Sequence, residues 1–192
     1  MRDEISRELE LFGFGPSLLQ AALRQFPKKM WCYQPREDRW SIHHIVIHLA
    51  DSEASAYIRC RRFIAEPGSP VLKFDGQRWA QSLGYFNQSA REALDIIFHL
   101  RKATYKLLCA LPDPVWDNRV MHHRVGEITL KKWMMIHERH IPHHVDQMRE
   151  NYTVWARTHP QRKPATPSQV EPADLREPIE VKSFRPNDLK YC

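Results

Sequence analysis

The sequence predicts an all-α protein that consists of one helical domain and a C-terminal tail. Two observations support this prediction. Four long segments repeat their apolar residues at the three- and four-residue spacing that places them on one face of a helix. Stretches that contain proline or glycine separate these segments and end the periodic pattern. With 192 residues, of which 42% are hydrophobic, the chain can bury one sizeable core.

The first helix is predicted over Glu4–Phe26. The run Gly13–Pro16 indicates a break within it, because proline lacks the backbone N–H that a helix interior needs and suits the first turn of a resumed helix. After this break the chain has a core-facing apolar stripe, which consists of Leu18, Leu19, Ala22, Leu23 and Phe26.

The second helix is predicted to begin after Ser41, which is a typical N-cap residue, and to run over Ile42–Ala65. Its apolar face consists of Ile42, Ile45, Val46, Leu49 and Ala56. His48 lies along the edge of this face, so we expect its side chain to point inward. Farther along the same helix the chain carries three arginines, Arg59, Arg61 and Arg62.

The second half of the domain begins with a long loop over 71–87, and the third helix follows over Ser89–Ala110. The loop contains the aromatic residues Trp79, Tyr85 and Phe86. We expect them to cap the core, and the alternative is that they line a pocket. Polarity alternates over 119–127, which predicts a short extended pair. Thr129 is the predicted N-cap of the fourth helix, Leu130–Ala156. The residues on or near its buried face are Trp133, Ile136, His140, His144 and Met148.

The composition changes at Thr158, after which six prolines follow by Pro186 among charged residues. Such a segment has too few large apolar side chains to bury a core of its own. We therefore divide the chain into a helical domain, 1–157, and a Pro-rich tail, 158–192, that is irregular or extends along the helices.

Composition also disfavours several classes of protein. No run of about 18 apolar residues predicts a membrane span, and the charged N-terminus lacks the apolar run of a secretory signal, which favours the cytoplasm. The four cysteines lack the C-x-x-C spacing of a zinc knuckle. The net charge of +6 is spread along the chain, which favours an ordinary solvated surface first, an anionic small substrate second and nucleic acid third.

Histidine is concentrated in the predicted fourth helix, where His137, His140, His143 and His144 fall within eight residues. Residues four apart on a helix project from the same face, so His140 and His144 can bind one metal ion together. A third ligand must come from elsewhere in the chain, and the inward-facing His48 is the best candidate.

The pattern W-S-x6-H-L-A-D from Trp40, followed by H-x3-H on the last helix, resembles the DinB/YfiT-like superfamily over roughly Met1–Tyr152. This resemblance implies an up-down-down-up four-helix bundle. It also implies a divalent metal ion held by His48, His140 and His144. The sequence departs from the family pattern by offering other histidine ligands, His44, His137 and His143. It also places Pro142 between the two ligands of the last helix, where proline can bend the helix.

Three neutral ligands leave the ion its charge and an open position, which is the pattern of a catalytic site. Zinc, nickel and iron all suit such nitrogen ligands. The family includes transferases that use low-molecular-weight thiols, so the resemblance implies that the metal activates a thiolate or water to attack a small electrophile. Arg59 or Arg62 is the candidate contact for an anionic group of this substrate.

Two acidic residues near His48, Asp51 and Glu53, could accept a hydrogen bond from a ligand imidazole. Glu53 could instead approach the metal or lie on a solvated helix face. No clear general base lies in the motifs, so no catalytic residue is assigned. The alternative function is therefore a non-catalytic, stress-associated metal-binding bundle. We expect a homodimer in either case.

Overall fold

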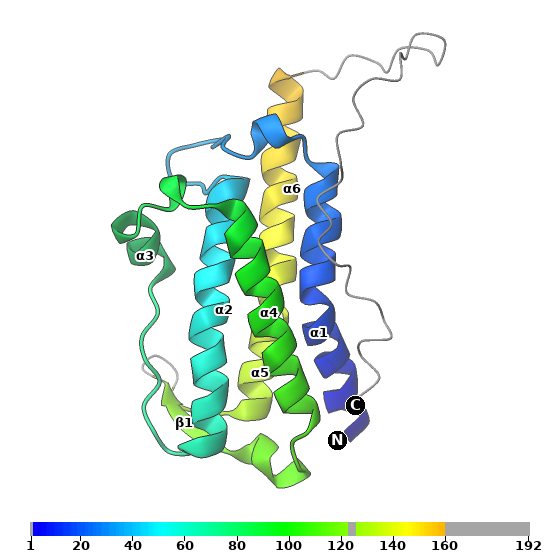
Figure 1. The fold of residues 1–192 in the computed structure, drawn as a ribbon, viewed down its shortest axis with the longest axis vertical. Helices are drawn as coiled ribbons and strands as arrows, with labels where there is room; N and C mark the ends of the chain where they lie inside the picture. The colour runs from blue at the N-terminus through cyan, green and yellow to red at the C-terminus, as the bar shows by residue number, and fades with distance from the viewer. Residues whose placement is uncertain (1, 123–125, 160–192) are drawn as a thin grey trace.

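The computed structural model describes residues 2–122 and 126–159. Most of these residues belong to long helices that pack side by side, some antiparallel and some parallel. The long helices are α1 (Arg2–Gln25), α2 (Ile42–Ala65), α4 (Ala90–Cys109) and the consecutive pair α5 (Leu130–Glu138) and α6 (His140–Thr158). In Figure 1, α1 and the α5–α6 pair run upward while α2 and α4 run downward. This order confirms the predicted up-down-down-up four-helix bundle.

Short elements connect the helices at the two ends of the bundle. They are the 3₁₀ turns η1 (Lys28–Met30), η2 (Tyr85–Asn87) and η3 (Asp113–Asp117), the helix α3 (Gly76–Ser82) and the strands β1 (Arg119–His122) and β2 (Gly126–Thr129). The two strands pair antiparallel, with Arg119 opposite Thr129, which confirms the predicted extended pair. Because α2 and α4 run in the same direction, the chain between them must cross the length of the bundle, and α3 lies on this crossover (Figure 1).

The N-cap residues predicted from sequence begin their helices as expected. The side-chain oxygen of Ser41 accepts a hydrogen bond from the backbone N–H of His44, and that of Thr129 accepts one from Lys132. The boundaries of α2 are those predicted, and α4 is one residue shorter at each end than the predicted third helix.

The predicted break at Gly13–Pro16 is wrong, since α1 is continuous through Pro16. Proline at this position leaves the carbonyl of Phe12, four residues earlier, without its helical N–H partner. The Nη1 atom of Arg101 on α4 donates to this carbonyl at 3.2 Å. A side chain from another helix therefore satisfies the acceptor that the proline leaves free.

The fourth helix is not the single helix expected over Leu130–Ala156, because α5 ends at Glu138 and α6 begins at His140. Pro142 has no N–H to donate to the carbonyl of Glu138, so the helical hydrogen bonding fails at this point. Ile136, near the end of α5, is 55% exposed and does not lie on the buried face that was predicted for it.

The aromatic residues of the crossover have different environments. Tyr85 is buried at 1% exposure and caps the core as predicted. Trp79 and Phe86 are 37% and 66% exposed, so the same expectation is wrong for them. The expected Pro-rich tail lies outside the described residues, apart from Thr158 and His159 at the end of α6. Over the described ranges, no helix combines the length and apolar character that a membrane crossing requires.

The core has two apolar clusters, one at each end of the bundle. The cluster nearer the top of Figure 1 includes Leu19, Met30, Ile42, Leu49, Ile97, Ile141 and Met148. The other cluster includes Phe12, Phe63, Leu108, Leu130, Trp133 and Met134. Between them, α2, α4 and α5 contribute Glu53, Arg101 and His137, which we call the buried polar layer. The candidate metal centre lies beside this layer.

Candidate metal centre

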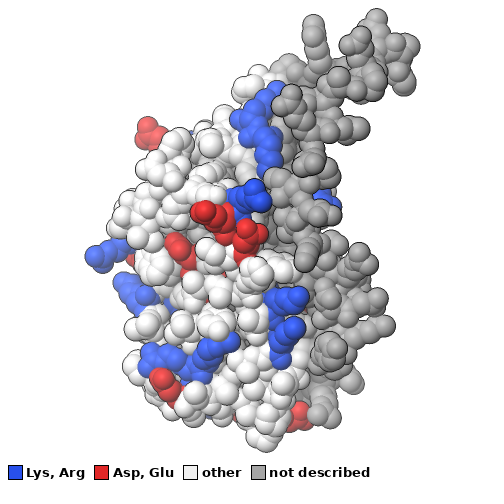
Figure 2. Space-filling view, viewed as in Figure 1, with Lys and Arg blue, Asp and Glu red and all other residues white. Residues whose placement is uncertain are grey.

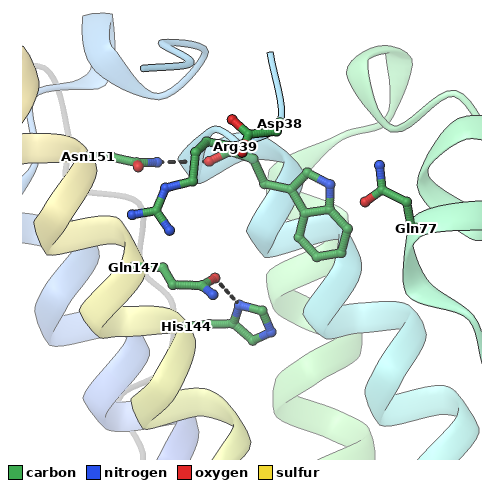
Figure 3. Close-up of a pocket in the computed structure, with 7 residues that line it drawn as sticks. Asp38, Arg39, Gln77, His144, Gln147 and Asn151 are labelled. Atoms are coloured by element: carbon green, nitrogen blue, oxygen red, sulfur yellow. Dashed lines mark hydrogen bonds between the residues drawn. The ribbon is translucent and has the colours of Figure 1, made fainter. Parts of the chain in front are cut away.

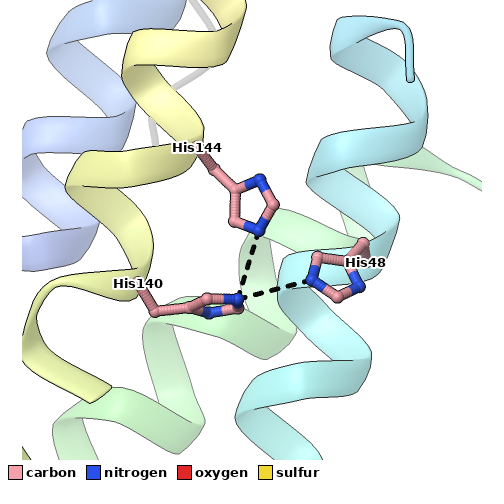
Figure 4. Close-up of side chains that lie close together, drawn as sticks. All are labelled: His48, His140 and His144. Carbon is pink, nitrogen blue, oxygen red and sulfur yellow. Dashed lines mark hydrogen bonds between the residues drawn. The ribbon is translucent and has the colours of Figure 1, made fainter. Parts of the chain in front are cut away.

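Three imidazoles from two distant parts of the sequence converge beside the buried polar layer. Figure 4 shows His48 on α2 facing His140 and His144 on α6. The Nε2 atom of His140 lies 3.4 Å from that of His48 and 3.1 Å from that of His144. All three rings can therefore present one nitrogen to a common point, and the three ligand atoms lie within 4.8 Å of one another.

The local sequence explains this convergence. Ser41 fixes where α2 begins, which sets the rotation of the helix and turns His48 inward, where it is 6% exposed. The four-residue spacing on α6 places His140 and His144 on one face, one turn apart. His140 is the first residue of α6, so the break at Arg139 does not separate the two rings.

All three imidazoles are held in the neutral form. Burial lowers the pKa of His48 to about 3 and that of His144 to about 4, although the hydrogen bond with Gln147 opposes the shift at His144. Burial and the neighbouring imidazoles also lower the pKa of His140. Neutral imidazole has the free lone pair that binds a metal ion, so the cluster is in its ligating state near neutral pH.

Both rings of α6 have a polar partner on the side away from the cluster, and the partner of His144 sets its tautomer. The Nδ1 atom of His144 lies 2.8 Å from the side-chain oxygen of Gln147, which can only accept, so Nδ1 carries the hydrogen. The Nδ1 atom of His140 lies 3.4 Å from the hydroxyl of Ser52. A hydrogen on Nδ1 leaves Nε2 with a free lone pair that points into the cluster.

The third ring, His48, is enclosed by apolar groups. Its ring centroid lies 4.6 Å from that of Trp40 and 5.8 Å from that of Phe74, and Gly76 packs against its edge. A Cβ atom on Gly76 would lie 2.7 Å from Cε1 and 2.9 Å from Nδ1 of His48. The chain can approach this closely only because residue 76 has no side chain, and the contact holds the ring in place.

The buried polar layer supports the cluster from the side of α4. The carboxylate of Glu53 accepts hydrogen bonds from Nε and Nη2 of Arg101, the first at 2.9 Å, and lies 3.2 Å from Nε2 of His137. Burial alone would raise the pKa of Glu53, but the positive charge of Arg101 and the contact with His137 lower it well below its usual value. The expectation that Glu53 approaches the metal or faces solvent is wrong, because it is 2% exposed and paired.

Sequence reasoning missed this role of Arg101. It lies within an apolar track of α4, where a charged residue would ordinarily mark the edge of the buried face. It is fully buried, and its guanidinium also lies 4.0 Å from the ring centroid of Phe12. The contact between His137 and His140, whose ring centroids lie 5.6 Å apart, connects the layer to the cluster.

The other candidate histidines have different partners. Nδ1 of His44 lies 2.7 Å from the hydroxyl of Ser41, and His137 contacts Glu53. His143 is exposed and lies 3.1 Å from the amide nitrogen of Gln147. Asp51 accepts a hydrogen bond from the hydroxyl of Tyr85 at 2.6 Å, rather than from an imidazole. Among the described residues, the histidines that form a metal-ligand group are therefore the three that the resemblance implied.

The arginines expected to contact substrate lie farther along α2. The Nη2 atom of Arg59 donates to the backbone carbonyl of Leu72 at 2.8 Å, and its buried Nε atom has no hydrogen-bond partner among the described residues. Arg62 forms an ion pair with Glu66. Neither arginine lines the cavity next to the histidines, so their role in substrate binding stays a prediction.

A cavity of about 210 Å³ opens beside the cluster, and His144 forms part of its wall. The other lining residues are Asp38, Arg39, Trp40, Gln77, Gln147 and Asn151. Figure 3 shows Arg39 above Gln147 and His144 on the side of α6, with Gln77 reaching in from α3 on the other side. Sequence reasoning missed Arg39 and Gln77, since both lie in connections without periodicity, where no pattern indicates which way a side chain points.

Comparison with known proteins finds relatives that are described as metal-dependent. A protein of Oceanobacillus iheyensis that is named as a candidate metal-dependent hydrolase is 30% identical over 110 residues, which are 57% of this chain and 63% of that protein. The match thus spans less than two thirds of that relative. YfiT of Bacillus subtilis has the same description and is 23% identical over 155 residues, which are 78% of this chain and 87% of YfiT.

Solved structures show the same fold. The structure of YfiT, described as having an unusual four-helix bundle topology, has a TM-score of 0.73 with 20% identity and covers 83% of this chain and 89% of that one. A mycothiol-dependent maleylpyruvate isomerase has a TM-score of 0.62 with 12% identity and covers 75% of this chain and 60% of that one. The family model described as the DinB superfamily matches residues 12–148, which are more than half of the chain. The chain therefore belongs to the DinB superfamily.

Proposed function

We propose that this protein is a divalent-metal-dependent enzyme in which His48, His140 and His144 hold the ion. The convergence of their three Nε2 atoms is the observation that supports the proposal. Nε2 of His140 is close to both neighbours but can carry only one hydrogen, so it can donate to only one of them. A cation satisfies all three lone pairs at once.

The distances fit a transition metal. Nitrogen ligands at the usual zinc–nitrogen distance of about 2.0–2.1 Å in a tetrahedral site lie roughly 3.3–3.4 Å from one another. The observed separations of 3.4 and 3.1 Å are close to this value. Nickel and iron accept the same ligands, so the proposal includes zinc, nickel or iron.

A bound ion with an open position would lower the pKa of a water molecule or a low-molecular-weight thiol for attack on a small electrophile. The protein's own residues prepare this site. Gln147 keeps a hydrogen on Nδ1 of His144, the hydroxyl of Ser52 can accept one from Nδ1 of His140, and Trp40 and Phe74 shield His48 from water. The relatives named as metal-dependent hydrolases and the fold shared with a mycothiol-dependent isomerase support hydrolysis or thiol transfer as the reaction class.

The proposal is tested by elemental analysis of the purified protein together with assays of ester hydrolysis and thiol consumption by generic electrophiles. We expect about one ion per chain and a turnover that is lost when the three histidines are replaced together. The control is His143→Ala, an exposed histidine on the same helix. Protein that contains no ion, and turnover that survives the triple replacement, would contradict the proposal.

The alternative is a metal-binding bundle without turnover, which we propose as a homodimer like the enzyme. One observation favours it: Asp38, the acidic residue lining the cavity, is paired through both carboxylate oxygens with Arg36 and is not a free general base. Bound metal without any turnover would support this alternative. Light scattering of the purified protein tests the dimer.

The hydrogen bond from His144 to Gln147 predicts that Gln147→Leu lowers the affinity for the metal ion. The leucine cannot accept from Nδ1, so the ring loses the partner that fixes its orientation. Loss of such a partner typically weakens metal binding by about 10- to 100-fold. A competition titration against a chelator measures this change. His143→Ala removes the other partner of Gln147, and it should leave the affinity unchanged if Gln147 acts through His144.

The contact between Gly76 and His48 predicts that Gly76→Ala weakens metal binding. The new Cβ atom would lie under 3.0 Å from two ring atoms, so the imidazole must move away from the other two ligands. We expect a decrease in affinity of about tenfold or more, as for other changes that misorient a ligand. Ser82→Ala at the end of the same helix is the control. Equal affinities of Gly76→Ala and the wild type would show that the glycine does not position His48.

A further inference from the structure

The metal centre is closed on most sides by the protein itself. His48 packs between Trp40 and Phe74, with Gly76 at its edge. His140 packs against His137. His144 is the ligand that lines the cavity of about 210 Å³. This cavity therefore gives a small molecule a route to an ion on the three histidines.

Most polar groups in the cavity wall already have partners. Gln147 contacts His144 and His143 through its two side-chain atoms, and Asn151 donates to the backbone carbonyl of Trp40 at 2.8 Å. The Asp38 carboxylate is paired with Arg36. These groups shape the wall but are not available to a ligand.

Two groups in the wall keep free hydrogen-bonding capacity. Arg39 uses one of its guanidinium nitrogens, Nη2, for Glu150, and the other two have no partner in the described part of the chain. Gln77 lies on the opposite side of the cavity from the Arg39 guanidinium (Figure 3), and its side-chain amide has no hydrogen bond with the described residues. The unused groups are thus mainly N–H donors, and one of them carries a positive charge.

We propose that this cavity is a subsite for the carboxylate of a small substrate or thiol, with Arg39 as its main contact and Gln77 as a second donor. The inference rests on the proposed metal-dependent function, because it places the other end of the molecule at the ion. The planar fork of arginine matches a carboxylate, and the ring of Trp40 offers an apolar surface for the carbon chain between the two ends. A volume of about 210 Å³ suits a molecule of few atoms.

Glu150 is the natural competitor for this carboxylate. Its ion pair with Arg39 is solvent-exposed, with the two side chains 35% and 59% accessible. Exposed pairs of this kind contribute little free energy, so an incoming carboxylate can share or replace the contact. Removing the Glu150 charge should therefore strengthen carboxylate binding, whereas removing the Arg39 charge should weaken it.

The test compares mercaptopropionate with mercaptopropanol, which differ in the carboxylate, by calorimetric titration into zinc-loaded protein. We expect the wild type to bind mercaptopropionate about tenfold or more tightly than the alcohol. Arg39→Gln should remove this preference, Gln77→Ala should reduce it and Glu150→Gln should increase it. Arg149→Gln, an exposed arginine on α6 paired with Asp146, should leave it unchanged. Zinc content, measured on the same samples, should be equal in all variants.

The outcomes separate this subsite from the proposed function. The subsite is overturned, and the metal site left intact, if the wild type binds the two thiols equally. The same conclusion follows if the preference for mercaptopropionate survives Arg39→Gln, or if Arg59→Gln removes it instead. Failure of mercaptopropionate to bind zinc-loaded wild type also overturns the subsite. Wild type that binds no zinc overturns the proposed function. In that case glutarate is titrated into the metal-free chain, and binding that does not depend on Arg39 overturns the subsite as well.

Discussion

Replacing His140 with alanine is expected to abolish stoichiometric metal binding. His140 is the central ligand, since its Nε2 atom lies 3.4 and 3.1 Å from those of the other two histidines. Its loss leaves only two ligands, His48 and His144, whose ring centroids lie 4.8 Å apart. The affinity should decrease by more than the roughly 10- to 100-fold caused by loss of a ligand's hydrogen-bond partner. Elemental analysis after dialysis and a chelator competition titration measure the change.

The matched control for this variant is His143→Ala, which removes an exposed imidazole three residues away on the same helix. It should retain the metal content of the wild type. Circular dichroism should show that both variants keep their helices, so that a loss of metal is not a loss of fold. A full complement of tightly bound metal in His140→Ala would place the ion elsewhere.

Replacing Arg101 with methionine is expected to produce the largest loss of stability. The ion pair between Arg101 and Glu53 is buried, with side-chain exposures of 0% and 2%. Breaking such a pair leaves a buried charge without its partner, which typically costs about 3–5 kcal/mol. This variant also removes the donor to the carbonyl of Phe12. The free energy of unfolding, measured by urea denaturation, should decrease by about that amount, which is a large part of the usual total of about 5–15 kcal/mol.

Two further variants show whether the buried charge causes this loss. The double variant Glu53→Gln with Arg101→Met should recover part of the stability, because it removes the unpaired carboxylate and keeps a hydrogen-bond partner for His137. Arg149→Met breaks an exposed pair on α6 and should cost no more than about 1 kcal/mol. Equal effects of Arg101→Met and Arg149→Met would contradict a structural role for the buried pair.

Local patterns predicted the fold because helix periodicity and N-caps depend on neighbouring residues. Ser41 and Thr129 begin their helices where the sequence indicated. The same local reasoning failed at Pro16, where a distant arginine supplies the missing hydrogen bond and α1 continues. Pro142 likewise leaves the carbonyl of Glu138 without its helical N–H partner, and the helix is interrupted at Arg139.

The three clustered histidines could be proposed from sequence because their spacing and the family pattern agree. The residues that support them could not. Arg101 and Glu53 are paired across 48 positions, and a single sequence does not reveal such a pair. Arg39 reaches the cavity from an irregular connection and Gln77 from the short helix α3 of the crossover, and the side-chain directions of both depend on how these segments pack on the bundle.

The buried polar layer also determines how the helices are aligned along the bundle axis. Most of the remaining core side chains are aliphatic or aromatic, and such surfaces can slide past one another at modest cost. A shift of α4 by one turn, about 5.4 Å, would move Arg101 away from Glu53 and place its charge among apolar side chains. This ionic contact thus favours a single axial register of α2 against α4. The contact of Glu53 with His137 acts in the same way between α2 and α5, which favours the register in which the imidazoles of α2 and α6 lie at the same height.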